Sequence, residues 1–269
     1  MVAYGLGIPP LIRELHQAHP GITQNWYADE SRAGGTFEGN LRHLDDLMVK
    51  GPPRSYFLDP TKSILVVFPW NVSWVEAFFH GYGFQIVTGS HYLWGFVGTR
   101  AEKDCWLGEK AEGWGDSVAT LAGVARWHPQ TAYTGLQKFL HQEWAFVQRV
   151  TPDIGMEFQV AEDALRGIFL LHFFQGATKH IPGRAITGLP VKQAGIFLPV
   201  PTRTVGANWT ESCVITGYLI TAIRGTAKFR SGDHDLLMRE GRKDIYQRHA
   251  EEAETALGEA RSATSKLDA

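Results

Sequence analysis

The chain has 269 residues, of which 44% are hydrophobic, 12% aromatic and 20% charged. This composition provides enough apolar surface for a core in one or two domains, and it excludes disorder throughout the chain. The formal net charge of -2 excludes the strongly basic overall field of many nucleic-acid binders, so that any binding of this kind requires a local basic patch.

Cysteine content and apolar runs indicate the compartment. The chain has two cysteines, Cys105 and Cys213, which are too few for a disulfide framework or a cysteine-based zinc site and favour a reducing compartment. The N-terminus has no basic region before an apolar run, so we expect no signal peptide. The apolar runs at 64–68 and 167–174 are far shorter than the roughly 20 residues that cross a bilayer. We therefore expect an intracellular protein, nuclear or cytoplasmic, without a membrane span.

The first hundred residues predict an α+β region, with glycine or proline at most changes of direction. In chain order, the patterns predict a helix over 9–18 that begins on its two prolines, a hairpin over 22–28 and 29–35, a helix over 41–48, a strand over 62–68, a helix over 74–80, and strands over 84–88 and 91–97.

The rest of the chain has a helical period of apolar residues. The predicted helices cover about 102–127, 130–150, 157–174 and 209–225, and 176–208 is predicted to be an irregular connection rich in Gly, Pro and Thr. From 233 to 269 the sequence is dense in Glu, Arg and Ala. Its narrow apolar seam is typical of a solvated helix or a partner contact.

Several common catalytic and cofactor motifs are not found. The chain has no GxSxG, GxxxxGK, GxGxxG, HExxH or paired CxxC pattern, which removes the usual support for hydrolase, NTPase and dinucleotide-binding functions. His16 with His19, and the run 233–235 of Asp, His and Asp, could contribute to a metal site. Without further ligands at a defined spacing, solvated surface is the better interpretation of both.

One short segment carries a possible chemistry. Residues 24–30, Gln-Asn-Trp-Tyr-Ala-Asp-Glu, place two adjacent acids at the predicted hairpin turn. An acidic turn is by itself an ordinary structure. The segment also resembles the Tyr-x-Asp-Asp hairpin of reverse transcriptases. Nucleotidyl transfer uses two divalent ions about 4 Å apart, so hard oxygen ligands must converge at one point, and adjacent acids provide part of that set.

The surrounding sequence extends the resemblance to the reverse-transcriptase domain of non-LTR retrotransposons. In that family the hairpin precedes a helix, a strand carrying a lysine, and a Tyr-Leu-Gly-like primer grip. Here the same order is given by Leu41 to Met48, by Lys62, and by Tyr92-Leu-Trp-Gly95. The stretch 189–199 is similar to a Leu-Pro and glycine-bearing segment that follows the thumb in these elements.

The resemblance implies roles for individual residues. Asp29 and Glu30 would be catalytic ligands of Mg²⁺, Lys62 would lie near the triphosphate and assist departure of pyrophosphate, and Tyr27 would support the hairpin beside the primer end. The nucleic-acid contacts would come from Tyr27 and from the grip residues Tyr92, Leu93, Trp94 and Gly95. Without the resemblance, Lys62 is equally a solvated lysine and Tyr27 a half-buried strand aromatic.

The implied fold is α+β, a truncated polymerase palm with a short antiparallel sheet, followed by a helical thumb and a C-terminal extension. Its divisions would be a partial palm over 1–100, a helical thumb over 101–175, and a connection with a charged helical extension over 176–269. In this fold the hairpin, with Asp29 at its tip, lies on one sheet with the strands near 64 and 86.

The chain also departs from the family. The upstream strand with a third carboxylate and a Gln-Gly-Asp-Pro-like turn are not found, since 26 residues precede Tyr27. Glu30 replaces the usual second aspartate and is one methylene longer, and Trp94 stands at a glycine of the grip. We therefore expect weak or no activity from the chain alone. The expected partners are a primer–template nucleic acid and a fingers-palm fragment.

Three other functions remain open. The first is a non-catalytic nucleic-acid-binding remnant that contacts phosphates with the thumb cations Lys103, Lys110, Arg126, Lys138 and Arg149. The second is a structural or interaction protein whose exposed aromatics, among them Trp70, Trp74 and Trp127, face partners. The third is a hydrolase built from His and Asp residues separated in sequence, which leave no local signature.

Overall fold

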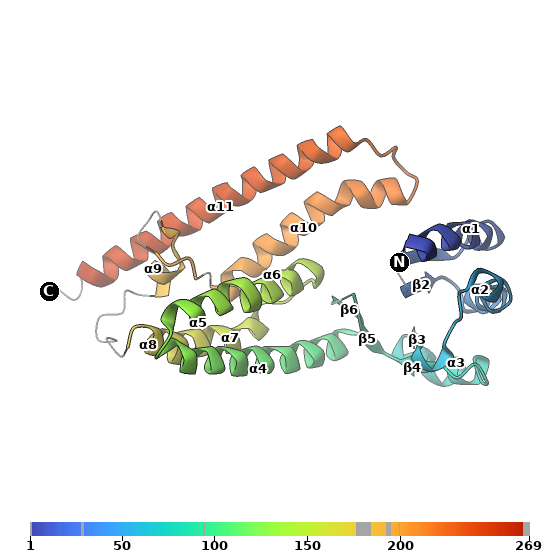
Figure 1. The fold of residues 1–269 in the computed structure, drawn as a ribbon, viewed down its shortest axis with the longest axis horizontal. Helices are drawn as coiled ribbons and strands as arrows, with labels where there is room; N and C mark the ends of the chain where they lie inside the picture. Colours follow the sequence, from blue (N-terminus) through green and yellow to red (C-terminus); the bar gives the residue numbers. More distant parts are fainter. Residues whose placement is uncertain are drawn as a thin grey trace. The chain divides into compact units, whose positions relative to one another are not determined.

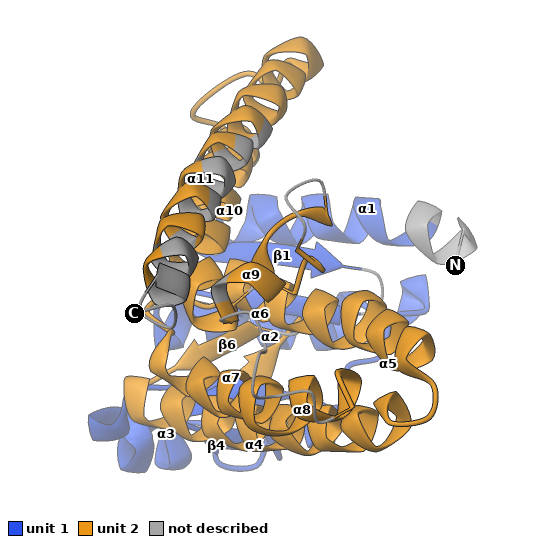
Figure 2. Ribbon diagram, turned by 90° about the vertical axis from the view of Figure 1, so that its left-hand side faces the viewer, with its two compact units in different colours: residues 1–90 blue, residues 91–269 orange. Residues whose placement is uncertain are grey.

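The fold is given by a computed structural model, which describes residues 2–27, 30–93, 95–175, 184–191, 195–198 and 200–265. The chain divides into two compact units, unit 1 over residues 1–90 and unit 2 over residues 91–269 (Figure 2). The expected α+β class is confirmed, with helices predominating and with short two-stranded sheets (Figure 1).

Unit 1 alternates short helices and strands. Its elements are α1 (Val2–Ala18), β1 (Thr23–Tyr27), β2 (Glu30–Gly34), α2 (Phe37–Lys50), the 3-10 turns η1 (Pro52–Arg54) and η2 (Pro60–Lys62), β3 (Ile64–Val66), the 3-10 turn η3 (Pro69–Asn71), α3 (Val72–Phe78) and β4 (Gln85–Val87). The unit boundary falls within β5 (Gly89–Tyr92).

Helix α1 is longer than predicted. Pro9 and Pro10 lie inside it rather than at its start. The buried residues Ile8, Leu11 and Leu15 recur at helical spacing, so the buried stripe already includes the turn that contains the prolines. Packing of this stripe outweighs the local proline signal on which the predicted boundary depended.

Helix α2 confirms the predicted helix over 41–48 and extends it at both ends. Thr36 caps it, since its side-chain oxygen accepts a hydrogen bond from the Gly39 backbone N–H at 3.1 Å. The buried positions are Gly39, His43 and Leu47, spaced four residues apart. Leu47 joins Ile8, Leu11 and Leu15 in the first core cluster of unit 1, which Tyr56 completes.

The strands of unit 1 do not form one sheet, so the expected common sheet is wrong. β1 and β2 pair antiparallel, whereas β3 and β4 pair in parallel in a separate sheet with Ile64 opposite Gln85. Parallel strands need a crossover connection, and α3 provides it. The second core cluster of the unit, built on Val67, Val75 and Phe79, lies between this helix and its two strands.

Unit 2 begins within β5 and continues with β6 (Gly95–Gly98), and these two strands pair with each other. The single strand expected over 91–97 is therefore wrong. The remaining elements are α4 (Arg100–Ala125), α5 (Pro129–Gly135), a π-helical turn η4 (Leu136–Leu140), α6 (His141–Val150), η5 (Met156–Phe158), α7 (Gln159–Ala164), a second π-helical turn η6 (Leu165–Phe169), α8 (Leu170–Phe173), α9 (Arg184–Gly188), α10 (Pro201–Ile223) and α11 (Ser231–Ser265).

The larger of two apolar clusters in the described part of unit 2 lies around α4, and the smaller one is built on Leu189. The axis of the larger cluster is α4, which buries a stripe of residues at helical spacing: Leu107, Ala111, Trp114, Val118, Ala122 and Ala125. Trp114 stacks on Phe158 with ring centroids 5.1 Å apart and meets Trp144 edge-on. Helices α5 to α8 and the start of α10 pack around this stripe, as Figure 1 shows.

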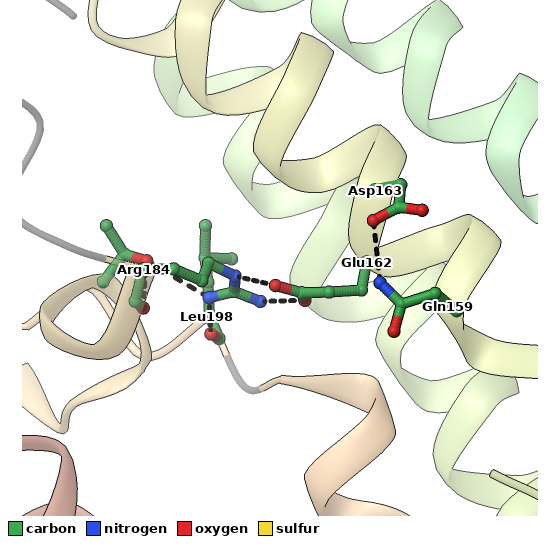
Figure 3. A network of polar contacts seen from close by, with 6 residues as sticks. Gln159, Glu162, Asp163, Arg184 and Leu198 are labelled. Atoms are coloured by element: carbon green, nitrogen blue, oxygen red, sulfur yellow. Dashed lines mark hydrogen bonds and ion pairs between the residues drawn. The ribbon is translucent and has the colours of Figure 1, made fainter. Parts of the chain in front are cut away.

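The segment after α8 is more ordered than expected. Within the predicted irregular connection, α9 forms, and α10 begins at Pro201 rather than at 209. A buried ion pair fixes α9, because the Arg184 guanidinium donates to both carboxylate oxygens of Glu162 at 2.9 and 3.0 Å (Figure 3). The same guanidinium donates to the Leu198 carbonyl at 2.6 Å and to the Thr187 hydroxyl at 3.1 Å.

Candidate active site on the β1–β2 hairpin

The predicted hairpin is confirmed for its two strands. β1 and β2 pair over their full length, with Trp26 opposite Ser31 and Tyr27 opposite Glu30. Along the chain, residues 28 and 29 join the strands, and they lie outside the described residues. Asp29, the main ligand implied by the resemblance, is therefore known only by its position in the sequence, between two strand ends that lie side by side.

The inner face of the hairpin is anchored to the first core cluster. The ring of Trp26 meets that of Tyr56 edge-on, with centroids 5.3 Å apart. On the neighbouring strand, the Ser31 hydroxyl shares a hydrogen bond of 2.8 Å with the Tyr56 hydroxyl. Tyr56 is buried with Leu11 and Leu15 from α1. The hairpin thus has a fixed inner side that determines which residues face outward.

The outer face carries the candidate chemistry. Residues of alternate strand positions share a face, so Asn25 and Tyr27 of β1 lie on the same face as Glu30 and Arg32 of β2. All four are exposed, and the Tyr27 side chain is 65% exposed. The alternative interpretation of Tyr27 as a half-buried strand aromatic is therefore wrong. The structure brings Tyr27 and Glu30 together as a directly opposed pair, a phenol beside a carboxylate.

Lys62 lies in a different local structure from the one expected. It is the last residue of the turn η2 and not the first residue of a strand, because β3 begins at Ile64. Its ammonium lies 3.4 Å from the Asp59 carboxylate, and its side chain is 84% exposed. Asp59 caps the same turn by accepting hydrogen bonds from the Thr61 hydroxyl and backbone N–H, which together lower the pKa of that carboxyl.

Within the described ranges, neither Tyr27 nor Glu30 forms a hydrogen bond or ion pair with Lys62, whose ammonium pairs with Asp59. Lys62 is held only by a surface ion pair, which contributes little to stability and leaves the long side chain free to take other positions. The structure therefore groups Tyr27 with Glu30 and leaves Lys62 as a separate exposed cation of unit 1.

The predicted primer grip, residues 92–95, falls within unit 2. Tyr92 is half-buried, and Leu93 is 39% exposed with a backbone φ of 46°, a left-handed conformation typical of a tight turn. Trp94 lies outside the described residues. Gly95 is buried, and a Cβ there would lie 3.4 Å from Val150, so this position is already close-packed against α6.

Sequence reasoning missed a cluster of two histidines and an aspartate in unit 1. His43, expected on the polar face of its helix, is 4% exposed, and its ring lies 5.5 Å from that of His19. His19 Nε2 lies 3.0 Å from Asp46 Oδ2, so His19 is not the solvated residue that was expected. Burial is the main cause that lowers the pKa of His43, and the charge of the neighbouring His19 lowers it further. The spacing of four between His43 and Leu47 was the sequence signal for burial.

The cations proposed for phosphate contacts fall into two groups. Lys103 donates to the Pro152 carbonyl, and Lys110 pairs with Glu143, so both serve contacts within unit 2. The others, Arg126, Lys138 and Arg149, are exposed. Of the aromatics expected at the surface, Trp70, Trp74 and Trp127 are confirmed as exposed.

The fit of the site to Mg²⁺ depends on the hairpin acids. Glu30 is an exposed carboxylate, and carboxylate oxygen is the donor that Mg²⁺ prefers. Among the described residues, no group of three or more His, Cys, Asp or Glu side chains is arranged to hold a metal ion. Glu30 is thus a single exposed carboxylate that belongs to no such group.

No protein-family model, no curated protein and no solved structure matches the chain. In the part of the chain that the structure describes, no helix has both the length and the apolar character required of a membrane span.

Proposed function

We propose that the chain is the palm-hairpin and thumb portion of a reverse-transcriptase-like polymerase, which takes part in RNA-directed DNA synthesis when another protein segment supplies a further carboxylate. The observation that carries this proposal is the register of the hairpin. Tyr27 and Glu30 are opposed on an exposed face, across a two-residue connection that contains Asp29 in the sequence.

The order of elements supports the same proposal. The hairpin is followed by the helix α2, by Lys62 in an exposed turn, by the paired strands β5 and β6, and then by a helical unit built on α4. This is the order hairpin, helix, lysine, grip and thumb of the family that the sequence resembles. The division into palm and thumb is part of the proposal.

Each residue of the proposed site has a chemical role. Asp29 and Glu30 would hold Mg²⁺, which supplies charge neutralisation when pyrophosphate departs. Tyr27 presents an exposed ring beside them, against which the primer end is supported. Lys62 holds a positive charge on a flexible stem that can leave Asp59 for a triphosphate oxygen.

The test is complementation of primer extension. The full chain is mixed with a fingers-palm fragment of a reverse transcriptase that ends before its own Tyr-x-Asp-Asp hairpin, with an RNA template, a DNA primer and Mg²⁺. We expect incorporation from the mixture and loss of at least about 100-fold in Asp29→Asn or Glu30→Gln, in line with removal of a metal ligand. Glu38→Gln, an exposed acid of α2, is the matched control and leaves incorporation unchanged.

A gain-of-function variant sharpens the test. Glu30→Asp restores the usual second aspartate of the family, so we expect it to raise incorporation by the mixture. The proposal is wrong if the mixture incorporates no nucleotide, or if incorporation is the same in Glu30→Gln as in the parent chain. Because Glu30 is exposed and packs against no core cluster, these variants retain the fold, which circular dichroism checks.

A second function is favoured by one observation. Arg126, Lys138 and Arg149 are exposed on unit 2, and the Arg126 guanidinium lies over the ring of Trp127, 5.4 Å from its centroid. A cation beside an exposed aromatic ring suits phosphate and base contacts without catalysis. If the complementation assay fails and the triple variant R126Q/K138Q/R149Q loses salt-sensitive binding of a primer–template duplex, this function replaces the first.

A further inference from the structure

The hairpin of α10 and α11 carries a basic loop. The two helices run side by side in opposite directions, and residues 224–230 connect them at one end (Figure 1). Three cations, Arg224, Lys228 and Arg230, fall within these seven residues, and all three are exposed. The stretch 212–232 contains no acidic residue, although the whole chain has a net charge of -2. The charge of the loop is therefore a local departure from the composition of the chain.

The loop backbone is fixed by one tyrosine. The Tyr218 hydroxyl donates to the Lys228 carbonyl at 3.1 Å and accepts from the Arg230 backbone N–H at 2.7 Å. Between these two contacts, the ring of Phe229 packs against that of Tyr218, with centroids 5.8 Å apart. The backbones at Lys228 and Arg230 are thus held at both sides of a packed aromatic residue.

The start of the loop is equally ordered. Gly225 follows the C-cap residue Arg224 of α10 and has a φ of 73°, a left-handed conformation that glycine adopts without strain. Both Thr226 and Ala227 then donate their backbone N–H groups to the Thr221 carbonyl. A loop that presents cations on a fixed backbone loses little conformational entropy on binding a charged ligand, which is how preorganisation increases affinity.

The three cations are available to a ligand. Within the part of the chain that the structure describes, no ion pair to Arg224, Lys228 or Arg230 is found, in contrast to Lys50, Arg54 and Lys110, each of which pairs with a carboxylate. The nearest acids in sequence are Asp233 and Asp235, in the first turn of α11. A ligand with several negative charges and no apolar requirement suits this surface.

We propose that the loop 224–230 binds the phosphate backbone of an RNA–DNA duplex, outside the candidate active site. The choice of a duplex as ligand rests on the proposed function, whereas the loop itself is independent of it. An anionic membrane surface is the competing ligand. It is disfavoured because Phe229, at 49% exposure, has about half of its surface covered by packing on Tyr218 and His234, which leaves Ile223, at 78% exposure, as the most exposed large apolar side chain of the loop region.

The test measures binding of a labelled RNA–DNA duplex to the full chain by fluorescence anisotropy over a series of salt concentrations. Replacement of three phosphate-contacting cations in R224Q/K228Q/R230Q should lower the magnitude of the slope of log K against log salt by about 2.7, at about 0.9 per contact. We expect the affinity to fall by at least about 10-fold at low salt.

Two control variants separate local contacts from net charge and from folding. R13Q/R42Q/R166Q removes the same charge from three exposed residues elsewhere in the chain, and we expect its affinity to stay within about 2-fold of the parent. R224K/K228R/R230K keeps the charge of the loop and should retain the parent affinity and slope. Equal losses in the two glutamine triples, or loss in the charge-keeping triple, would overturn the proposal.

A second binding experiment distinguishes a nucleic-acid duplex from a membrane surface as the ligand of the loop. Vesicles containing phosphatidylserine replace the duplex, and the proposal is overturned if the loop triple loses vesicle binding while its duplex binding is unchanged. The complementation assay separates this inference from the proposed function. Loop-dependent duplex binding without complementation removes only the polymerase proposal, and complementation with unchanged duplex binding by the loop triple removes only this one.

Discussion

The two units reach stability by different means. Unit 2 has a large continuous apolar core around α4, with Phe158 and Phe169 fully buried in it, and a small second cluster at Leu189. Unit 1 has two smaller clusters, and its helices are also joined by polar contacts such as those of Glu14 with Lys50 and Arg54. The candidate active site therefore lies on the unit with the smaller apolar clusters, whose ion pairs are partly exposed, whereas the buried ion pair of Glu162 and Arg184 lies in unit 2.

The largest expected effect is loss of an aromatic from the core of unit 2. Phe158→Ala removes the partner on which Trp114 stacks and leaves a cavity, so we expect unit 2 to lose about 4 kcal/mol. Leu11→Ala in unit 1 should cost about 2 kcal/mol, the low end for such a change, because a smaller cluster relaxes more easily. Urea unfolding followed by tryptophan fluorescence measures both.

Met156→Ala is the control for this comparison, since Met156 is 82% exposed and should be replaced at no cost. Equal losses in Phe158→Ala and Leu11→Ala would contradict the difference between a large and a small core.

The next effect concerns the buried ion pair of unit 2. Glu162→Gln leaves the Arg184 guanidinium buried without its carboxylate, and we expect a loss of about 3 kcal/mol. The double variant E162M/R184M removes both charges and should recover much of this loss, because two apolar side chains need no partner. Thermal unfolding measures the relative stability of the parent chain, Glu162→Gln and the double variant. A double variant less stable than Glu162→Gln would contradict the prediction.

A smaller effect comes from the helix caps. Thr36→Ala removes the acceptor for the Gly39 N–H of α2 and should cost unit 1 about 1 kcal/mol. Thr99→Ala at α4 should cost less, since its contact to the Glu102 N–H is longer, at 3.4 Å, and the helix is held by a larger core. Urea unfolding measures the free energy of unfolding that each variant loses. A larger loss in Thr99→Ala than in Thr36→Ala would contradict the prediction.

At neutral pH, substitution of His43 is expected to have the smallest effect on the free energy of unfolding. Because its pKa is lowered in the folded chain, the unfolded chain binds the proton more readily, so stability rises with pH in the range where the two states differ. The contribution of neutral His43 is fully present above the unfolded pKa of about 6.5 and is lost as the pH falls below it. Unit 1 should therefore weaken on acidification.

His43→Leu should remove this part of the acid sensitivity and leave stability at pH 7.5 close to that of the parent chain, since the buried Nδ1 of His43 lacks a hydrogen-bond partner among the described residues. The control is His16→Gln, at an exposed position of α1, which should keep the acid sensitivity. The measurement is the unfolding midpoint of each chain at pH 5.0 and 7.5. An equal fall of the midpoint on acidification in the parent chain and in His43→Leu would contradict the prediction.

The sequence predicted elements whose signals are local. The stripe of Leu41, Leu44 and Leu47 predicted the helix that α2 confirms, and the hairpin strands follow from alternation and turn composition. The sequence did not predict the structure of positions that are fixed by contacts with residues far away in the chain. Arg184 was assigned to an irregular connection because its partner Glu162 is 22 residues away, and no local period reports such a contact.

The candidate site was predicted in the same uneven way. Tyr27 and Glu30 were expected together at the hairpin, where strand alternation fixes the faces, and the structure has them opposed. Lys62 was assigned to a strand on the strength of the apolar run that follows it. Asp59 and Pro60 instead form a capped turn that includes Lys62, and this preference outweighs the β-branched residues after it.

The hairpin also bears on how such a chain changes over generations. Its inner face packs through Trp26 on Tyr56, whereas Tyr27 is 65% exposed and Glu30 is exposed on the outer face. Mutations at the outer positions should thus cost the fold less than mutations of Trp26 or Tyr56. Selection for folding alone would keep the inner pair while the outer residues vary, so the hairpin can persist whether or not its outer face has a function.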